Sequence, residues 1–186
     1  MRYYRLIDDV EAPGRWWLKS PCDTDGNLVN ADVFTVAKKI SLATPLRIPL
    51  RHDGIELDFT FGAFDMPVLN RRTFRLLEEF LLDGFQSFSA QVENHELGYE
   101  VVNFLECRQC VDESQSEFLK WGESDGRLDK IGQYRQITKL RIDPSLVQGL
   151  EVFRIEGWRI ALIVSENIRS AFEDKNISGI RFLPVS

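Results

Sequence analysis

The sequence predicts an α+β fold, in which two principal helices pack on one twisted, mainly antiparallel sheet. Strand-like segments outnumber helical ones, and each of the two helical segments lies between two strands. The strand-like segments within 134–160 follow one another closely enough to be hairpin neighbours. No low-complexity tract or Pro/Ser-rich linker divides the 186 residues, so we expect a single domain over residues 1–186.

The first third of the chain predicts short strands broken by turns. The β-prone runs are residues 3–7, 15–19 and 45–51. Pro49 cannot donate to a ladder, so the third run is expected at an edge or a strand end. Residues 55–64 form a fourth expected strand. It is expected to be half-buried, because the apolar residues Ile55, Leu57, Phe59 and Phe61 alternate with polar or small residues.

Two later segments, 68–92 and 163–185, share an order of strand, helix and strand. Asn70 and Ser165 are predicted N-caps, because their side chains accept hydrogen bonds from the first-turn N–H groups. Gly84 and Gly179 are the predicted helix stops, each 14 residues after its cap. The buried faces are expected to carry Phe74, Leu77 and Leu81 in the first helix, and Ile168 and Phe172 in the second. The recurrence fits either a duplication or chance repetition of a common local pattern.

Three further strands complete the expected sheet. Residues 98–111 are apolar on both faces at the centre, which predicts one long central strand. Residues 133–143 and 150–164 supply the others, separated by a turn at Asp143–Pro144, with a bend at Gly157.

The composition narrows the classes of partner. Lys and Arg total 23 against 29 Asp and Glu, a net charge of −6, which argues against a nucleic-acid binder and suits a basic partner. The N-terminus has no apolar signal-peptide core, and no window has 18 uninterrupted apolar residues. Three cysteines, an odd number, fit a reducing compartment, so we expect a cytoplasmic protein that makes no contact with a membrane.

No motif in the chain predicts catalysis, a metal or a cofactor. If residues 98–111 are one strand, Cys107 and Cys110 point to opposite faces and cannot share a metal, so they are expected to be packing thiols. His52 and His95 fall in predicted turns and are expected to be solvent-exposed. Ser165 faintly resembles a nucleophile elbow, but the flanking glycines are missing and a helix cap explains it.

The stretch 110–130 is the candidate site. Its acids gather around one tryptophan and two glycines, and the candidate residues are Asp112, Glu113, Glu117, Trp121, Glu123, Asp125 and Asp129. The interleaved bases, serines and glycines predict a flexible, exposed loop rather than a preorganised catalytic pair of carboxylates. An ordinary solvated loop and a partner-binding loop anchored by Trp121 both remain open.

The chain resembles a bacterial family of immunity proteins from polymorphic toxin systems, immunity family eleven. The resemblance is carried by residues 110–185 and by the N-terminal stretches "YYRL", "RWWL", "PLRIPLRHDGIELDFTF" and "MPVLN". It implies a small cytoplasmic, non-enzymatic protein that is encoded beside a toxin and neutralises it, and such toxins are often expected to be nucleases.

The acidic stretch and the resemblance together predict that residues 112–129 face a basic toxin and block it stoichiometrically. Two other classes compete with this hypothesis. One is a carboxylate-dependent hydrolase that uses Asp or Glu with His52, and the other is a scaffold module unrelated to toxins.

Overall fold

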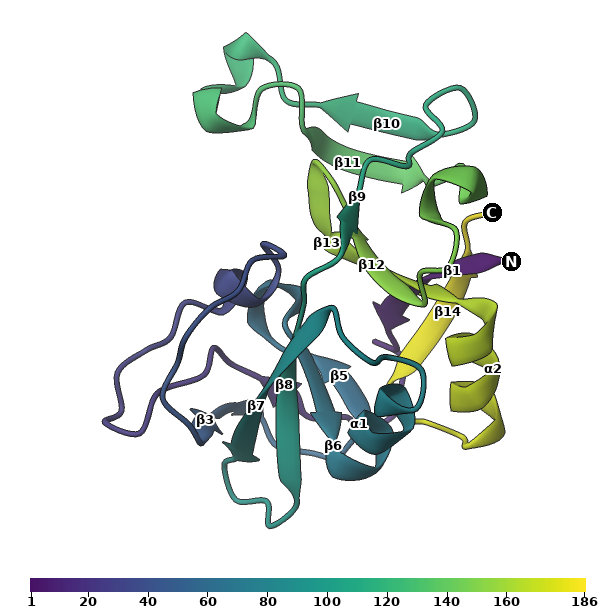
Figure 1. Ribbon diagram of the computed structural model, residues 1–186. Coiled ribbons are helices and arrows are strands. Elements are labelled where there is room, and N and C mark those ends of the chain that lie inside the picture. Colours follow the sequence, from purple (N-terminus) through teal and green to yellow (C-terminus); the bar gives the residue numbers. More distant parts are fainter.

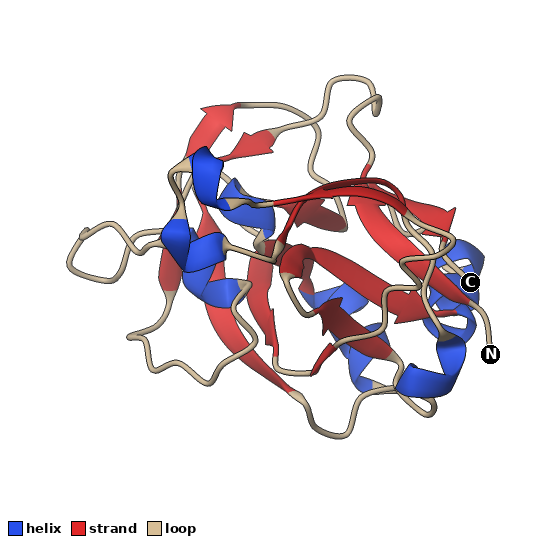
Figure 2. Ribbon diagram, turned by 90° about the horizontal axis from the view of Figure 1, so that it is seen from above, coloured by secondary structure: helices blue, strands red, loops and turns tan.

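The computed structural model describes residues 1–186 and contains more strands than helices (Figures 1 and 2). The helices are α1 (Arg71–Glu78) and α2 (Glu166–Asp174). The strands are β1 (Tyr3–Asp8), β2 (Trp17–Leu18), β3 (Leu46–Ile48), β4 (Leu50–His52), β5 (Phe59–Phe61), β6 (Pro67–Asn70), β7 (Phe85–Val92), β8 (Gly98–Phe104), β9 (Cys107–Arg108), β10 (Glu117–Lys120), β11 (Tyr134–Lys139), β12 (Val152–Ile155), β13 (Trp158–Ser165) and β14 (Ile180–Pro184). The predicted α+β class, with two helices and mainly antiparallel strands, is confirmed.

The strands divide over four sheets, so the expectation of a single sheet is wrong, although the α+β class holds. Sheet I has the order β3-β7-β8-β6-β5 and sheet II the order β14-β1-β13-β12-β9, while β10-β11 and β2-β4 form two-stranded sheets. Only β3–β7 in sheet I and β12–β9 in sheet II pair in parallel. The expected edge position of the segment around Pro49 is confirmed, since β3 is the edge of sheet I and the chain leaves it at that proline.

The two predicted strand–helix–strand units are β6–α1–β7 in sheet I and β13–α2–β14 in sheet II. In the first unit, β8 lies between the two strands and is antiparallel to both, so β6 and β7 run parallel. In the second unit, β1 lies between β13 and β14 in the same way. The two units therefore share one topology, with a single antiparallel strand inserted into each.

The helix starts agree with the sequence and the helix ends do not. Asn70 and Ser165 accept hydrogen bonds from Thr73 N (2.9 Å) and Ile168 N (3.3 Å), so both caps are confirmed. The glycine stops are wrong, because α1 ends at Glu78 and α2 at Asp174. In α2 it is Asn176 that takes the left-handed conformation, with Ile177 N donating to Phe172 O at 2.9 Å to close the last turn.

Three clusters of buried apolar residues form the core. The middle cluster lies between the two large sheets and combines residues of sheet I, sheet II and both helices, among them Leu69, Val102, Leu162, Leu77 and Phe172. The other face of sheet I packs on the N-terminal loops around Trp16 and Phe34. The other face of sheet II carries the third cluster, which includes Phe153, Trp158 and Ile163 and supports the β10–β11 hairpin.

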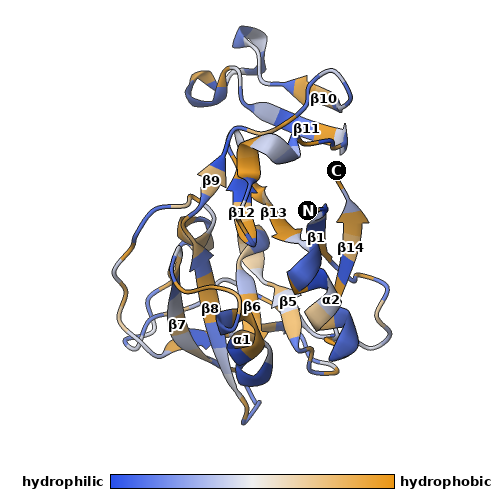
Figure 3. Cartoon of the chain, turned by 45° about the vertical axis from the view of Figure 1, so that its right-hand side comes forward, coloured by the Kyte–Doolittle hydropathy of each residue, from blue (hydrophilic) through white to orange (hydrophobic).

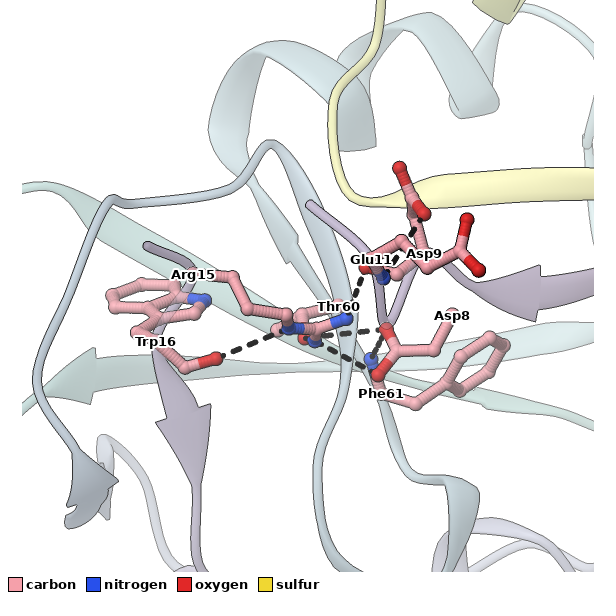
Figure 4. A network of polar contacts seen from close by, with 7 residues as sticks. All are labelled: Asp8, Asp9, Glu11, Arg15, Trp16, Thr60 and Phe61. Atoms are coloured by element: carbon pink, nitrogen blue, oxygen red, sulfur yellow. Dashed lines mark hydrogen bonds and ion pairs between the residues drawn. The ribbon is translucent and has the colours of Figure 1, made fainter. Parts of the chain in front are cut away.

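A buried ion pair ties the N-terminal loop to both large sheets (Figure 4). The Arg15 guanidinium lies 2.8 Å from the Asp8 carboxylate and donates to the Thr60 hydroxyl at 2.8 Å. It also donates to the carbonyls of Asp9 (2.8 Å) and Trp16 (3.3 Å), and it stacks 4.3 Å above the ring of Trp17. Only 3% of the Arg15 side chain and 17% of the Asp8 side chain are exposed, so the pair is largely removed from water.

A second buried arginine has no carboxylate partner. Arg154 on β12 is fully buried and donates to the carbonyls of Arg159 (2.7 Å) and Phe34 (3.3 Å). Burial lowers the pKa of its guanidinium to about 10, because the charged form loses its hydration. Arg154 therefore joins sheet II to the N-terminal loops through hydrogen bonds to neutral acceptors.

Several expected strands have different limits. The predicted strand 98–111 is wrong beyond Phe104, because the chain leaves sheet I at Leu105 and Glu106 and enters sheet II as β9. Of the run 55–64 only Phe59–Phe61 is a strand. Gly157 lies in the tight turn between β12 and β13, and β11 pairs with β10 instead of β12. None of the helices has the length and apolar character needed to cross a bilayer.

Candidate functional site

Residues 112–139, called the arm here, project from the end of sheet II (Figures 1 and 3). The arm contains the β10–β11 hairpin and two short 3-10 turns at its tip, at Glu123–Asp125 and Leu128–Lys130. The prediction of a loop is wrong for Glu117–Lys120, which form β10, whereas the predicted exposure of the stretch is confirmed. No residue between Cys110 and Ile137 is buried, so within the arm only Ile137 belongs to the core.

The inner face of the arm explains why the hairpin forms. Phe118 on β10 lies opposite Ile137 on β11, and Ile137 is buried in the third core cluster. Phe118 and Tyr134 pack against the same cluster and meet edge to face, with ring centroids 5.3 Å apart. The backbone ladder continues past β10, because Trp121 N donates to Gln133 O at 2.9 Å. Apolar packing on one side therefore fixes the position of the arm.

Two of the candidate acids stabilise the base of the arm. Asp112 accepts hydrogen bonds from the amide and hydroxyl of Ser114 (3.0 and 2.6 Å) and from Gln115 (2.6 Å), and these lower its pKa. Glu113 pairs with Lys120 at 2.6 Å and accepts from the Tyr134 hydroxyl at 2.6 Å, and these contacts lower its pKa. Burial and then Glu113 raise the pKa of Tyr134, which keeps this hydroxyl a donor.

Two more acids hold the tip. Asp125 pairs with Arg135 at 2.9 Å and accepts from Gly122 N at 2.8 Å, which closes the first 3-10 turn. Asp129 forms a two-point contact with Arg127, at 3.0 and 2.9 Å, and this contact lowers the pKa of the Asp129 carboxyl. Glu117 and Glu123 are exposed and have no ion-pair partner.

The arm is consequently less acidic than a count of its acids suggests. Residues 112–139 contain six carboxylates and five cations, a formal net charge of −1. Four of the six carboxylates are already satisfied within the arm, so only Glu117 and Glu123 are free to attract an external cation.

Trp121 lies neither in the core nor free in solvent. Its side chain is half-buried, with the Lys130 ammonium 5.6 Å and the Arg135 guanidinium 5.0 Å from the ring. Cations this close to an indole face are attracted by its quadrupole. The two cations therefore hold the indole on the hairpin.

The residues weighed for catalysis are separate in the structure. His52 is exposed at the end of β4. The expectation for His95 is wrong, because its side chain is only 11% exposed, packs edge to face on Trp16 and contacts Glu56 and Asp53. This packing was missed because Trp16 and Glu56 are distant in sequence. Ser165 is a buried cap whose hydroxyl donates to Glu151.

Cys110 is a buried residue of the third core cluster, whereas Cys107 is half-buried and belongs to none of the three clusters, and the reason inferred from the sequence was wrong. Cys107 belongs to β9 and Cys110 follows it, so they do not share one continuous strand. Burial raises the pKa of Cys107, and it raises the pKa of Cys110 to about 12. The structure contains no group of three or more His, Cys, Asp or Glu side chains arranged to hold a metal ion.

The arm offers a projecting surface that strand pairing and apolar packing hold at its base. The sequence analysis predicted the acids and Trp121 of the arm as site residues but did not include Leu119, which is 61% exposed on β10. The period-two pattern of Phe118, Leu119 and Lys120 was the available signal, since it separates an inner from an outer face.

Comparison with known proteins identifies the family. The model of the immunity protein family Imm11 matches residues 64–186, which include both strand–helix–strand units and the whole arm. A search of the curated proteins finds no match to the chain. Since the family model covers more than half of the 186 residues, the chain belongs to the immunity protein family Imm11.

Proposed function

We propose that this protein binds a cognate bacterial toxin through its arm and blocks it stoichiometrically, without catalysis, in the cytoplasm. Family membership supports a toxin partner, and the projecting arm is the observation that supports the site. The contact surface would include Asp112, Glu113, Glu117, Trp121, Glu123, Asp125 and Asp129. Standard interfaces bury about 800 Å² on each partner, an area that a chain with 9985 Å² of accessible surface readily supplies.

The proposed toxin is basic, and a nuclease fits that description because its substrate is a polyanion. The net charge of −6 would draw such a toxin toward the chain before contact. Among the acids of the arm, Glu117 and Glu123 are the ones with no internal partner, so they would contribute most to this attraction. The other four keep the arm folded and would contribute indirectly.

The role is tested by protection and titration. Cells that express the toxin encoded beside this gene should survive when the chain is co-expressed, and purified chain should inhibit the purified toxin with a one-to-one endpoint. Protection at amounts far below one equivalent would indicate turnover and contradict a blocking role. Failure of the chain to bind that toxin would contradict the proposed function itself.

The electrostatic contribution is tested with charge reversal. The double variant Glu117→Lys, Glu123→Lys should associate about tenfold more slowly with an inactivated form of the same toxin at low salt, with little change in dissociation. The matched control is Asp83→Lys, Glu96→Lys, which changes net charge equally at exposed acids outside the arm. Equal association rates for the two double variants would remove Glu117 and Glu123 from the contact surface.

A further inference from the structure

We propose that the outer face of the arm is an apolar and cationic docking surface that binds the toxin at an apolar hollow bordered by carboxylates. The surface, called the outer patch here, consists of Leu119 and Trp121 framed by Lys130 and Arg135. This inference rests on the proposed function and names the chemistry by which the arm would hold its partner. The outer patch shares Trp121 with the contact surface above, and differs from it by adding Leu119 and by having cations in place of carboxylates around the indole.

The two faces of the hairpin are chemically distinct. Phe118 and Lys120 lie on the inner face, where the Lys120 ammonium sits 5.4 Å from the Phe118 ring and 5.1 Å from the Tyr134 ring. Leu119 lies between them in sequence and therefore points outward, as does Trp121 two residues further on. Leu119 pairs with Gln136, which is also exposed. The core thus covers one side of the hairpin and leaves Leu119 and Trp121 on the other.

Two cations are placed over the outer patch by the backbone. Arg135 occupies the irregularity in the ladder between the Leu119–Gln136 and Lys120–Tyr134 pairs, which brings its guanidinium over Trp121. Lys130 comes from the second 3-10 turn and has no carboxylate within ion-pair distance. Lys130 therefore carries its charge beside the Trp121 indole without a direct ion pair.

Folding alone does not account for the outer patch. An exposed leucine is common on protein surfaces and by itself indicates nothing. Here Leu119 neighbours a tryptophan and an arginine, the residue types that contribute most to binding at protein interfaces. Strand pairing fixes the backbone at Leu119, and the two cations hold the Trp121 indole before contact, which reduces the entropy lost on binding.

The occupant follows from the family and from the charge of the outer patch. A chain of this family implies a toxin partner, and the outer patch would require apolar atoms against Leu119 and Trp121 and an acceptor for Lys130. Glu117 and Glu123 would speed encounter, whereas the desolvated outer patch would set the lifetime of the complex.

The test uses an inactivated variant of the toxin encoded beside this gene as the probe. Leu119→Ser and Trp121→Ala should each raise the dissociation constant of the complex about 30-fold, mainly through faster dissociation. The control is Leu82→Ser, which changes a leucine that is 99% exposed and lies outside the arm. Each variant is also melted, and an unchanged Tm for Leu119→Ser shows that its effect is on binding and not on folding.

The outcomes separate the two proposals. Wild-type binding with unchanged dissociation for both outer-patch variants would overturn this inference and remove Trp121 from the contact surface, while the toxin-blocking role itself would stand. Absence of wild-type binding would overturn the proposed function. Slow association of the Glu117 and Glu123 variant combined with fast dissociation of the Leu119 variant would support both.

Discussion

Removing one member of the buried Asp8–Arg15 pair should destabilise the protein strongly. Replacement of Arg15 by Met keeps most of the apolar stem and removes the guanidinium, which makes four hydrogen-bonded or ionic contacts and one stacking contact. The Asp8 carboxylate would keep only Phe61 N at 3.2 Å and the Thr60 hydroxyl at 3.5 Å. Removing one partner of a buried pair costs about 3–5 kcal/mol.

The lower end of that range applies, because the Asp8 side chain is 17% exposed and water can reach it. A loss of about 3 kcal/mol corresponds to a Tm lower by about 6–12 °C for a chain of this size. Thermal and urea unfolding followed by circular dichroism measures both quantities. Arg51→Met is the matched control, since Arg51 is exposed and has no ion-pair partner, and its Tm should not change measurably.

The pH dependence supplies a second check on the same pair. Burial raises the pKa of Asp8 even in the wild type, outweighing the opposing effects of Phe61 N–H and Arg15. When the pKa of an acid is higher in the folded than in the unfolded state, the folded state binds its proton more tightly. The contribution of that acid to the free energy of unfolding is then fully present below the unfolded-state pKa and is lost as pH rises through the folded-state pKa. Arg15→Met raises the pKa of Asp8 further, so the free-energy deficit of the variant should be larger at pH 7 than at pH 4.

A double-mutant cycle completes the test of the ion pair. Asp8→Asn added to Arg15→Met removes the unpaired buried charge, so the double variant should be more stable than Arg15→Met alone. A loss below 1 kcal/mol in the Arg15→Met variant, or no recovery in the double variant, would refute the reasoning.

Two further predictions concern the backbone and the thiols. Gly179→Ala should lower the free energy of unfolding by about 3 kcal/mol or more, because φ is +94° and a Cβ would lie 2.0 Å from Phe59 O. Gly149→Ala is the control and should lower it by about 1 kcal/mol, since φ is +79° and the space around Gly149 is open. Equal unfolding free energies for the two variants would contradict this reasoning. At pH 8 only about 10⁻⁴ of Cys110 is thiolate if its pKa is about 12, so iodoacetamide should leave it unlabelled until urea unfolds the chain, as peptide mass spectrometry would show. Rapid labelling of Cys110 in the folded protein would show that the thiol is accessible.

The sequence predicted local features best. Asn70 and Ser165 were identifiable as caps because a cap depends on the side chain and the next three residues. The helix ends were missed because the prediction placed them at glycine, the residue that most often takes the left-handed conformation. In α2 that conformation is taken by Asn176, and Gly179 lies in the turn before β14. Caps are local, whereas the choice of stop depends on where the next strand must enter the sheet.

Sheet membership was the least predictable part. The chain passes from sheet I to sheet II at Leu105 and Glu106, within the run 98–111. The pattern of apolar residues in this run does not change at that point, so it could not predict the change of sheet. The candidate site was found from its acids and Trp121. Their internal pairing depends on contacts such as Arg135 with Asp125, ten residues away across the hairpin, and composition does not show these.

The absence of buried side chains between Cys110 and Ile137 has a consequence for which substitutions the fold tolerates. No residue of the tip, residues 121–133, belongs to any of the three core clusters. The residues of the tip can therefore be exchanged without changing the packing of either large sheet. Substitutions confined to the tip should therefore leave the thermal stability of the protein nearly unchanged.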